Sequence, residues 1–367
     1  MRLRPPLLLL AGGTVAAAVI AAPGVASATP VAKGPTVTVV NHTVLAPFQL
    51  AHDRHSVYVA DGGTGVVSKL TKKGLVPVAH APDSGEAAGV AINGKGTLAF
   101  TWTLRDSQGN TTATGLTIKP KYGKARTVDL LAFEQKRNPD KRISYGIDNP
   151  TPCQEQAFAP LGGASYKGMV DSHPYAVAAL PGDAWVVADA GGNDLLKVDR
   201  HGRIGVISVL PRQPFTITAS AAAGMDPPLP DCVVGAVYHF EAVPTDVEVG
   251  PRGVLISSLL PGGPEDPSFG ARGKVVAVSP RTGRAFTLAS GLAGATNVAL
   301  GQHGRIYVSE LFGGQISVLS HGRLRPYVQL DSPLGLTYFK GALYAGTFGP
   351  TDQQGNPTGP GTIVRIR

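Results

Sequence analysis

Three acidic side chains recur at equivalent places in this sequence and are its first candidates for binding chemistry. Asp61, Asp189 and Glu310 each end an alternating apolar strand, and a turn that contains glycine follows each of them. Acids gathered at one mouth of a β architecture could bind a cation or a polar ligand. An acid in a turn also commonly accepts hydrogen bonds from the backbone amides of that turn. We expect the turn-closing role here and keep ligand binding as the alternative.

Four further polar residues complete the set of candidate ligand-binding residues: His173, Asn193, Asp246 and Asn297. His173 precedes a strand and follows a long insertion, where an imidazole could act as an acid or a base. The sequence shows no partner for it, so a loop residue is the simpler interpretation. Asn193 extends the turn after Asp189, and it could reach a ligand or close the turn. Asp246 and Asn297 stand at the start of two repeated strands.

Motifs of the common catalytic sites are absent from the sequence. It contains no GxSxG elbow, no HExxH and no P-loop, so the catalytic residues, if any, are unknown. We assign no metal ligand and identify no cofactor. Calcium is the one ion left open, and it prefers six or more oxygens with several carboxylates among them. Only Asp246 and Asn297 among the residues that open the repeated strands could supply such oxygens.

The elements that must position these residues form a repeat. A strand-acid-glycine phrase occurs at residues 57–63, 186–192 and 306–314, and an apolar strand with a short polar turn precedes each copy. Self-similarity at about 40 residues in strand-like segments indicates a radial or solenoid β architecture. The chain divides into six units of strands, at residues 48–79, 89–131, 175–210, 246–290, 297–330 and 335–367.

The sixth unit has only three strands, and the β-rich segment at residues 36–44 is free to supply its fourth. Such a closure would remove two exposed sheet edges. The sequence therefore predicts an all-β fold, a six-bladed β-propeller whose last blade is closed by an N-terminal strand. A seven-bladed ring with a blade hidden in residues 135–172 is the alternative, although that stretch lacks alternating strands.

Long connections fall on one face of the predicted propeller. They are the second-to-third turns and the crossings between blades, at residues 103–114, 135–172, 211–243, 260–273 and 349–361. Because long loops on a rigid scaffold commonly carry binding and catalysis, we expect this long-loop face to be the functional one. Cys153 and Cys232 lie in two of these loops, and in an exported protein with two cysteines we expect them to form a disulfide.

The first residues indicate export. Arg2 and Arg4 precede an apolar run at residues 7–20, and Ala26-Ser27-Ala28 fits a signal-peptidase site. We predict a signal peptide at 1–28 and a single propeller domain at 29–367, secreted or held in the periplasm or cell wall, with no transmembrane segment in the mature chain. Removing Arg2 and Arg4 lowers the formal net charge from +8 to about +6. The densest basic cluster, at 136–142, has no interleaved aromatic residues, so we expect no nucleic-acid partner.

One segment resembles a known family. The run from His173 to Asp199 is similar to the hallmark segment of the ScyD/ScyE family of exported β-propellers, and residues 243–251 and 296–301 look like its next two blade openings. The similarity covers the mature chain and is strongest from His173 onward. It implies a propeller and export, with no established reaction. More distantly, the repeated phrase is similar to NHL repeats and to the calcium-dependent gluconolactonase-like and the strictosidine-synthase-like propellers, which place metal ligands at the inner strands.

Two functions of different classes follow from these observations. The leading hypothesis is a monomeric, exported ScyD/ScyE-type propeller that binds a small molecule or an extracellular protein or polymer through its long-loop face. The alternative is a metal-dependent lactonase or ester hydrolase of the gluconolactonase-like class, with its metal in the channel. An accessory role in an exported-metabolite pathway rests on the family name alone. Whether the protein is an enzyme stays open at this stage.

Overall fold

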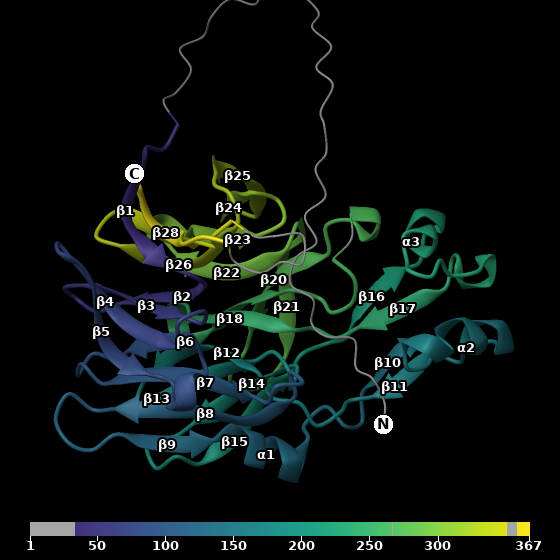
Figure 1. Ribbon diagram of the computed structural model, residues 1–367, viewed down its shortest axis with the longest axis horizontal. Helices are drawn as coiled ribbons and strands as arrows, with labels where there is room; N and C mark the ends of the chain where they lie inside the picture. Colours follow the sequence, from purple (N-terminus) through teal and green to yellow (C-terminus); the bar gives the residue numbers. More distant parts are fainter. Residues whose placement is uncertain (1–33, 266, 351–357) are drawn as a thin grey trace, which may run out of the picture.

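The protein is built almost entirely of antiparallel β-sheets (Figure 1). The computed structural model describes residues 34–265, 267–350 and 358–367. The predicted signal peptide at 1–28 and the middle of the predicted loop at 349–361 lie outside the described residues. None of the helices in the described part of the chain is long and apolar enough to cross a membrane.

Six four-stranded sheets follow one another along the chain. The first contains β2 (Pro47–His52), β3 (Val57–Asp61), β4 (Val66–Thr71) and β5 (Gly74–His80). The second contains β6 (Glu86–Ile92), β7 (Leu98–Arg105), β8 (Thr111–Lys119) and β9 (Arg126–Asp129). The third contains β12 (Pro174–Leu180), β13 (Ala184–Asp189), β14 (Asp194–Val198) and β15 (Ile204–Val209).

The remaining three repeat the pattern, and the last of them takes a strand from the other end of the chain. The fourth sheet contains β18 (Pro244–Val249), β19 (Leu255–Leu259), β20 (Gly273–Val278) and β21 (Ala285–Leu292). The fifth contains β22 (Ala295–Leu300), β23 (Ile306–Glu310), β24 (Gln315–Ser320) and β25 (Arg323–Gln329). The sixth contains β26 (Pro333–Phe339), β27 (Ala342–Thr347), β28 (Gly361–Ile366) and β1 (Val37–Val44).

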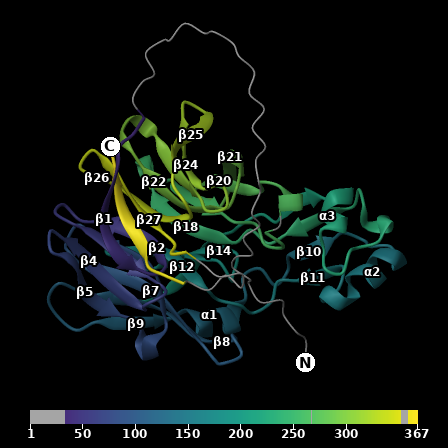
Figure 2. The same ribbon diagram turned by 45° about the horizontal axis from the view of Figure 1, so that its top comes forward.

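The strand β1 pairs with β28 in an antiparallel register that sets Val37 opposite Ile366 and Val44 opposite Gly361. Thr36 and Arg367 each donate a backbone N–H to the carbonyl of the other, which extends this pairing by one residue pair. The first described residues and the last residues of the chain therefore lie side by side in one sheet, as Figure 2 also shows.

Buried apolar side chains fill the space between neighbouring sheets. Trp185 of the third sheet is only 1% exposed and packs in a cluster with Leu116 of the second. Leu50 and Ile363 belong to a cluster shared by the first and sixth sheets. The innermost strands β2, β6, β12, β18, β22 and β26 contact one another in that order, and β26 contacts β2. These contacts form a closed circuit.

The two long insertions build a seventh sheet of their own, in the order β11-β10-β17-β16. Its strands are β10 (Ser144–Ile147), β11 (Ser165–Lys167), β16 (Gln213–Thr216) and β17 (Val237–Phe240). With helices α2 (Pro152–Phe158) and α3 (Ala219–Ala223) they form an insertion lobe that projects to the side of the six sheets (Figure 1). The predicted disulfide between Cys153 and Cys232 is present and joins the two insertions, with the Cα atoms 6.4 Å apart.

Three sequence-based expectations about the connections were wrong. The insertion at 135–172 contains β10 and β11, which are too short for alternation to reveal them and which find partners in the other insertion through β17. Residues 103–114 are mostly strand, because β7 and β8 pair almost to their tips and leave only 106–110 as a loop. A helix, α1 (Leu130–Arg137), replaces the end of the strand predicted up to residue 131, and Asp129 caps its N-terminus.

Short turns on the opposite face share one backbone conformation. Arg252 and Gly253 have φ of 59° and 78°, and His303 and Gly304 have φ of 55° and 71°. Two successive left-handed residues are the geometry of the type I′ turn, which matches the twist of the strands that it connects. Glycine at the second position allows this geometry, and the tight turns keep this face short.

Candidate functional site

The three acids that end the second strands share one structural task. Asp61, Asp189 and Glu310 are each at most 6% exposed, and each accepts a backbone N–H from the segment that leads into the first strand of its own sheet. The donors are Leu45 and Ala46 for Asp61, His173 for Asp189 and Ala293 for Glu310. The acid therefore ties the end of the second strand to the entry of the first. The acids therefore connect two strands and do more than close a turn. Their carboxylate oxygens are already occupied by these hydrogen bonds.

The central axis is crossed by three buried polar side chains, Gln49, Asp246 and Asn297, each at most 2% exposed. Gln49 donates from Nε2 to Oδ1 of Asp246 at 2.8 Å. Their other contacts are with the backbone. The N–H groups of Val90 and Val177 donate to Oε1 of Gln49, and that of Val298 donates to Oδ2 of Asp246. Asn297 accepts the N–H of Leu336 at Oδ1 and donates from Nδ2 to the carbonyl of Phe48. These bonds link the first strands of all six consecutive sheets.

This axis does not fit the calcium centre of the alternative hypothesis. The side-chain oxygens of Asp246 and Asn297 already accept hydrogen bonds, and burial raises the pKa of Asp246 to about 7. Burial and the nearby Asp246 also raise the pKa of Glu248. Calcium needs six or more oxygens. No group of three or more His, Cys, Asp or Glu side chains among the described residues already surrounds a point as metal ligands would.

Apolar side chains close the axis at its long-loop end. Phe48 and Tyr175 are 7% and 8% exposed, and their ring centroids lie 4.9 Å apart. The same cluster includes Ala88 and Leu334 from the second and sixth sheets, and Val243 and Leu311 from the segments beside β18 and β23. A ligand that approaches this end therefore meets a hydrophobic plug.

The structure gives His173 the partner that the sequence did not show. Nε2 of His173 lies 2.6 Å from Oε1 of Glu86, the first residue of β6, and the ring meets Tyr175 edge-on at 5.3 Å. The two side chains of the pair are 12% and 24% exposed, so solvent reaches them at the rim of the plug. A sequence signal for this pair exists but was missed. When the openings of β6 and β12 are aligned on Ala88 and Tyr175, Glu86 and His173 occupy the same position, two residues earlier.

Opposite charges shift both groups of this pair. Burial lowers the pKa of His173, but the attraction of the Glu86 carboxylate outweighs burial and the net pKa is raised. Burial raises the pKa of Glu86, but His173 and the more distant Arg105 lower it on balance. An imidazolium held by a carboxylate can bind an anionic or hydrogen-bonding group, and a neutral imidazole oriented in this way can accept a proton.

Asn193 acts as a clamp between the third sheet and the segment before the fourth. Its Oδ1 accepts the N–H of Val243 at 3.1 Å, and its Nδ2 donates to Asp140 at 3.2 Å. Asn193 and Val243 both have positive φ, 56° and 49°. Asparagine tolerates this conformation, whereas a β-branched residue adopts it only when its surroundings hold it there. The clamp therefore fixes one wall of the apolar plug.

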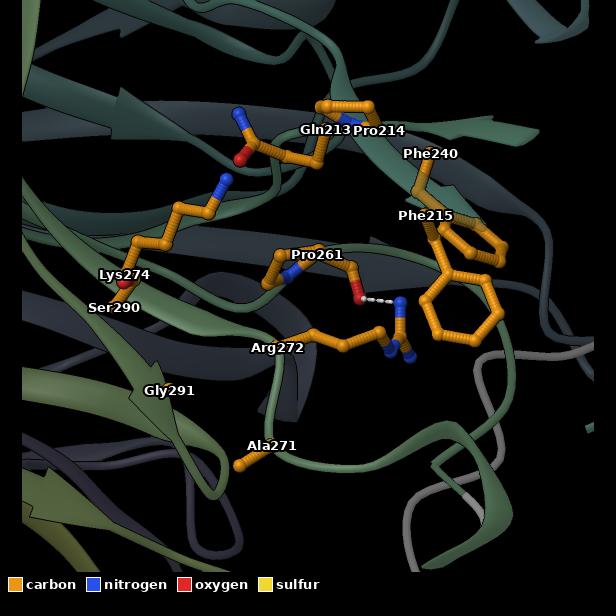
Figure 3. Close-up of a pocket in the computed structure, with 10 residues that line it drawn as sticks. All are labelled: Gln213, Pro214, Phe215, Phe240, Pro261, Ala271, Arg272, Lys274, Ser290 and Gly291. Carbon is orange, nitrogen blue, oxygen red and sulfur yellow. Dashed lines mark hydrogen bonds between the residues drawn. The ribbon is translucent and has the colours of Figure 1, made fainter. Parts of the chain in front are cut away.

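A pocket of about 250 Å³ lies between the insertion lobe and the outer strands of the fourth sheet (Figure 3). Arg272 fills one wall, with its guanidinium 4.6 Å from the Phe240 ring centroid and donating to the carbonyls of Gly262 and Pro264. Lys274 points toward Gln213 across the pocket, and burial lowers the pKa of its amine. Arg272 is held by protein groups, which leaves Lys274 as the cation that a small acid could meet here.

The seven predicted residues do not converge on one point. Asp61, Asp189 and Glu310 brace strand entries, Asp246 and Asn297 cross the axis, and Asn193 clamps a linker. His173 is the one whose imidazole lies at a solvent-reached rim in a pair with another charged side chain. The candidate site is therefore the His173–Glu86 pair and the rim of the apolar plug on the long-loop face.

Comparisons with known proteins identify the fold. No family model matches the sequence, and no curated protein does. A putative oxidoreductase (glucose dehydrogenase) from Thermus thermophilus is similar in structure, with a TM-score of 0.55 at 14% identity over 91% of this chain and 100% of that chain. The PQQ-bound aldose sugar dehydrogenase from Streptomyces coelicolor gives 0.53 at 12% identity over 92% and 99%. A gluconolactonase from Xanthomonas campestris gives 0.49 at 10% identity over 90% and 89%. Likeness to the first two at such identities shows a shared all-β fold alone.

Proposed function

We propose that the protein is an exported binding module that recognises a partner through its long-loop face. The observation that carries this proposal is the plugged axis. Side chains that bond to one another fill the middle, and Phe48, Tyr175 and their neighbours close the long-loop end. A channel filled in this way offers no internal chamber for a substrate, so recognition takes place on the rim and the loops around it.

Exposed apolar side chains on the same loops favour a protein partner. Met169 is 49% exposed just before the third sheet, and Phe312 is 39% exposed in the turn after β23. Leu161, Val234 and Val237 of the insertion lobe are 38–42% exposed. Aromatic and methionine side chains around a few charged groups are typical of protein interfaces. The His173–Glu86 pair supplies the charged group at the centre.

The proposal includes a six-bladed ring, formed as a single domain over residues 29–367 and closed by β1. It is supported by the pairing of β1 with β28, by the contact of β26 with β2 and by the apolar cluster that the first and sixth sheets share. The resemblance of residues 173–199 supports a ScyD/ScyE-type protein, and the pattern of residues 1–28 supports export with cleavage near Ala28. We propose that the mature protein acts as a monomer.

The alternative, a metal-dependent lactonase or ester hydrolase, is less well supported. It requires a set of oxygen ligands at the inner strands, and there Asp246 and Asn297 are committed to hydrogen bonds with Gln49 and with backbone amides. The His173–Glu86 pair could perform acid-base chemistry without that set, but the plug beneath it leaves a substrate only the outer rim.

A matched pair of variants tests the binding module. In the first, Met169→Asp and Phe312→Asp place two charges on the long-loop face. In the second, His201→Asp and His303→Asp place two charges on exposed turns of the opposite face. Immobilised protein is incubated with the extracellular fraction of the organism that encodes it, and bound proteins are quantified by mass spectrometry. We expect a partner retained by the wild type and by the second variant and lost from the first. Equal retention by both variants, or loss from the second alone, would contradict the proposal.

A further inference from the structure

Three buried carboxylates lie near the turn between β13 and β14 of the third sheet. Glu134 belongs to α1, Asp140 follows it and Asp194 begins β14, and each is at most 2% exposed. Both oxygens of Asp194, Oε1 of Glu134 and Oδ1 of Asp140 are buried without a hydrogen-bond partner. Native proteins rarely leave such groups unpaired, because each unmade bond costs about 1–3 kcal/mol.

The charges around these oxygens are negative. Burial and the carboxylates of Asp189, Glu134 and Asp140 raise the pKa of Asp194. Burial, Asp189 and Asp140 raise the pKa of Glu134 to about 8. Asp189 differs from the others because both of its oxygens accept hydrogen bonds, from Ser172, His173 and Gly192. A buried group of acids whose strongest charged neighbours are other acids is a place where positive charge is missing.

A space for a cation lies beside Gly192. At the position where a β-carbon would stand on Gly192, the nearest atoms are Oδ1 of Asp194, Oε2 of Glu134 and the carboxyl carbon of Asp189, each 3.6 Å away. Glycine thus leaves a small cradle among the acids. Calcium–oxygen distances are about 2.3–2.6 Å, so the carboxylates would have to move inward by roughly 1 Å to hold an ion there.

We propose that this cluster binds a calcium ion, held by Asp194 and Glu134 in the cradle beside Gly192. Donors that are all oxygen select a hard cation, and a site that closes by small side-chain movements suits calcium better than magnesium, which demands rigid octahedral geometry. The inward movement also explains why Asp194 and Glu134 do not already stand as part of a metal cage.

The ion would fasten the insertion lobe to the third sheet. Glu134 and Asp140 lie where the chain leaves the second sheet for the lobe, and Asp140 accepts a hydrogen bond from Tyr145 of β10 at 2.9 Å. Asp194 and Gly192 lie at the β13–β14 turn of the third sheet. The proposed site does not depend on the binding role of the long-loop face, because it concerns how that face is held.

Two pairs of variants test the site. Gly192→Ala fills the cradle without strain, because its nearest contacts at 3.6 Å are ordinary van der Waals distances, and Gly205→Ala is its control at an open position. Asp194→Asn removes a ligand charge, and the exposed Asp331→Asn is its control. Each protein is stripped with EDTA and passed into buffer with EDTA, CaCl₂ or MgCl₂. The melting temperature is then measured, and calcium binding is followed by isothermal titration calorimetry.

We expect calcium at about 100 times its Kd to raise the melting temperature of the wild type and both controls by at least ~3 °C. Gly192→Ala and Asp194→Asn should fold and show no calcium response. The proposal fails if calorimetry detects no calcium binding to the stripped wild type, or if Gly192→Ala responds as fully as Gly205→Ala. A response to magnesium alone overturns the assignment to calcium. If the wild type does not respond to calcium and Asp194→Asn is more stable than the wild type, the cluster is neutralised by protons and the proposal is overturned.

Discussion

His173 and Glu86 stand apart from the other polar side chains near the axis because both can carry charge and both are reached by solvent. Gln49, Asp246 and Asn297 are fully enclosed and bonded to backbone groups, so they hold strands together. The rim pair lies 2.6 Å apart with 12% and 24% exposure, and its strength must therefore vary with pH. The direction of that variation follows from the two pKa shifts.

Glu86→Gln should reduce stability most between about pH 4.5 and 6.5. The raised pKa of His173 gives stability that is fully present below 6.5 and is lost as the pH rises through the folded value. The lowered pKa of Glu86 gives stability that is present above 4.5 and is lost as the pH falls through the folded value. Urea unfolding across pH 4 to 9 should show a loss of about 1–2 kcal/mol in that window, and the loss should shrink as the pH rises through the raised pKa of His173.

Asp183→Asn is the control for this measurement. Asp183 pairs with Lys95 at the same 2.6 Å distance, but the two side chains are 41% and 74% exposed. Its loss should stay within about 0.5 kcal/mol at every pH. A Glu86→Gln curve parallel to that of the wild type from pH 4 to 9 would show that the pair is not charged in the folded protein.

Individual residues were predictable from the sequence when the repeat itself placed them. Asp61, Asp189 and Glu310 end β3, β13 and β23 as the repeated phrase predicts. The Cys153–Cys232 disulfide follows from an even cysteine count and is confirmed. The pairing of His173 with Glu86 joins residues 87 positions apart. Only the alignment of two strand openings could indicate this pair. The nearness of Glu134 to Asp194 could not be predicted, because Glu134 lies on a helix outside the repeat and Asp194 begins a strand.

The strands of the six consecutive sheets follow a two-residue period of apolar side chains, whereas the strands of the insertion lobe are too short to show one. β10 and β17 have four residues each, and the pairing that stabilises them comes from the other insertion. The lobe has its own small core around Phe158, Ile217 and Val233. The disulfide between α2 and η3 (Asp231–Val233) therefore carries a large share of its stability.

Replacing both cysteines, Cys153→Ser with Cys232→Ser, should loosen the insertion lobe before it affects the six consecutive sheets. Closing a loop with a sequence separation of 79 residues contributes up to about 4 kcal/mol on the chain-entropy model. Limited trypsin digestion, followed by intact-mass analysis, should find the first cuts of the variant within residues 138–172 and 211–243. The wild type reduced with TCEP should give the same fragments. First cuts in β2 to β5 would show that the disulfide supports the whole fold.

At the scale of the whole molecule, stability depends on how the first and last strands meet. β1 is the outer strand of the sixth sheet, and its Val44 packs with Leu50 and Ile363 between the first and sixth sheets. Removing β1 would expose the hydrogen-bonding edge of β28 and open this apolar cluster.

Two N-terminal truncations test this closure. A chain that begins at Gly34 keeps β1 and should unfold like a chain that begins at Thr29, whereas a chain that begins at Leu45 lacks it. The shorter chain should lose at least ~3 kcal/mol, because buried Val44 and the whole β1–β28 ladder are absent, and it should form larger species on size exclusion. Equal melting temperatures and monomeric elution of both chains would show that β1 is dispensable.

The polar bridge across the axis also sets the order in which the chain can complete its fold. Gln49 reaches Asp246, 197 residues later, and Asn297 reaches the carbonyl of Phe48 across 249 residues. A polypeptide that emerges N-terminus first holds Gln49 without its partner until more than half of the sequence has followed. Contacts between such distant residues form slowly, because the loop between them must close first. The first sheets therefore cannot complete their hydrogen bonds across the axis until the later sheets have formed. The interior becomes fully bonded only when the last strands have been synthesised.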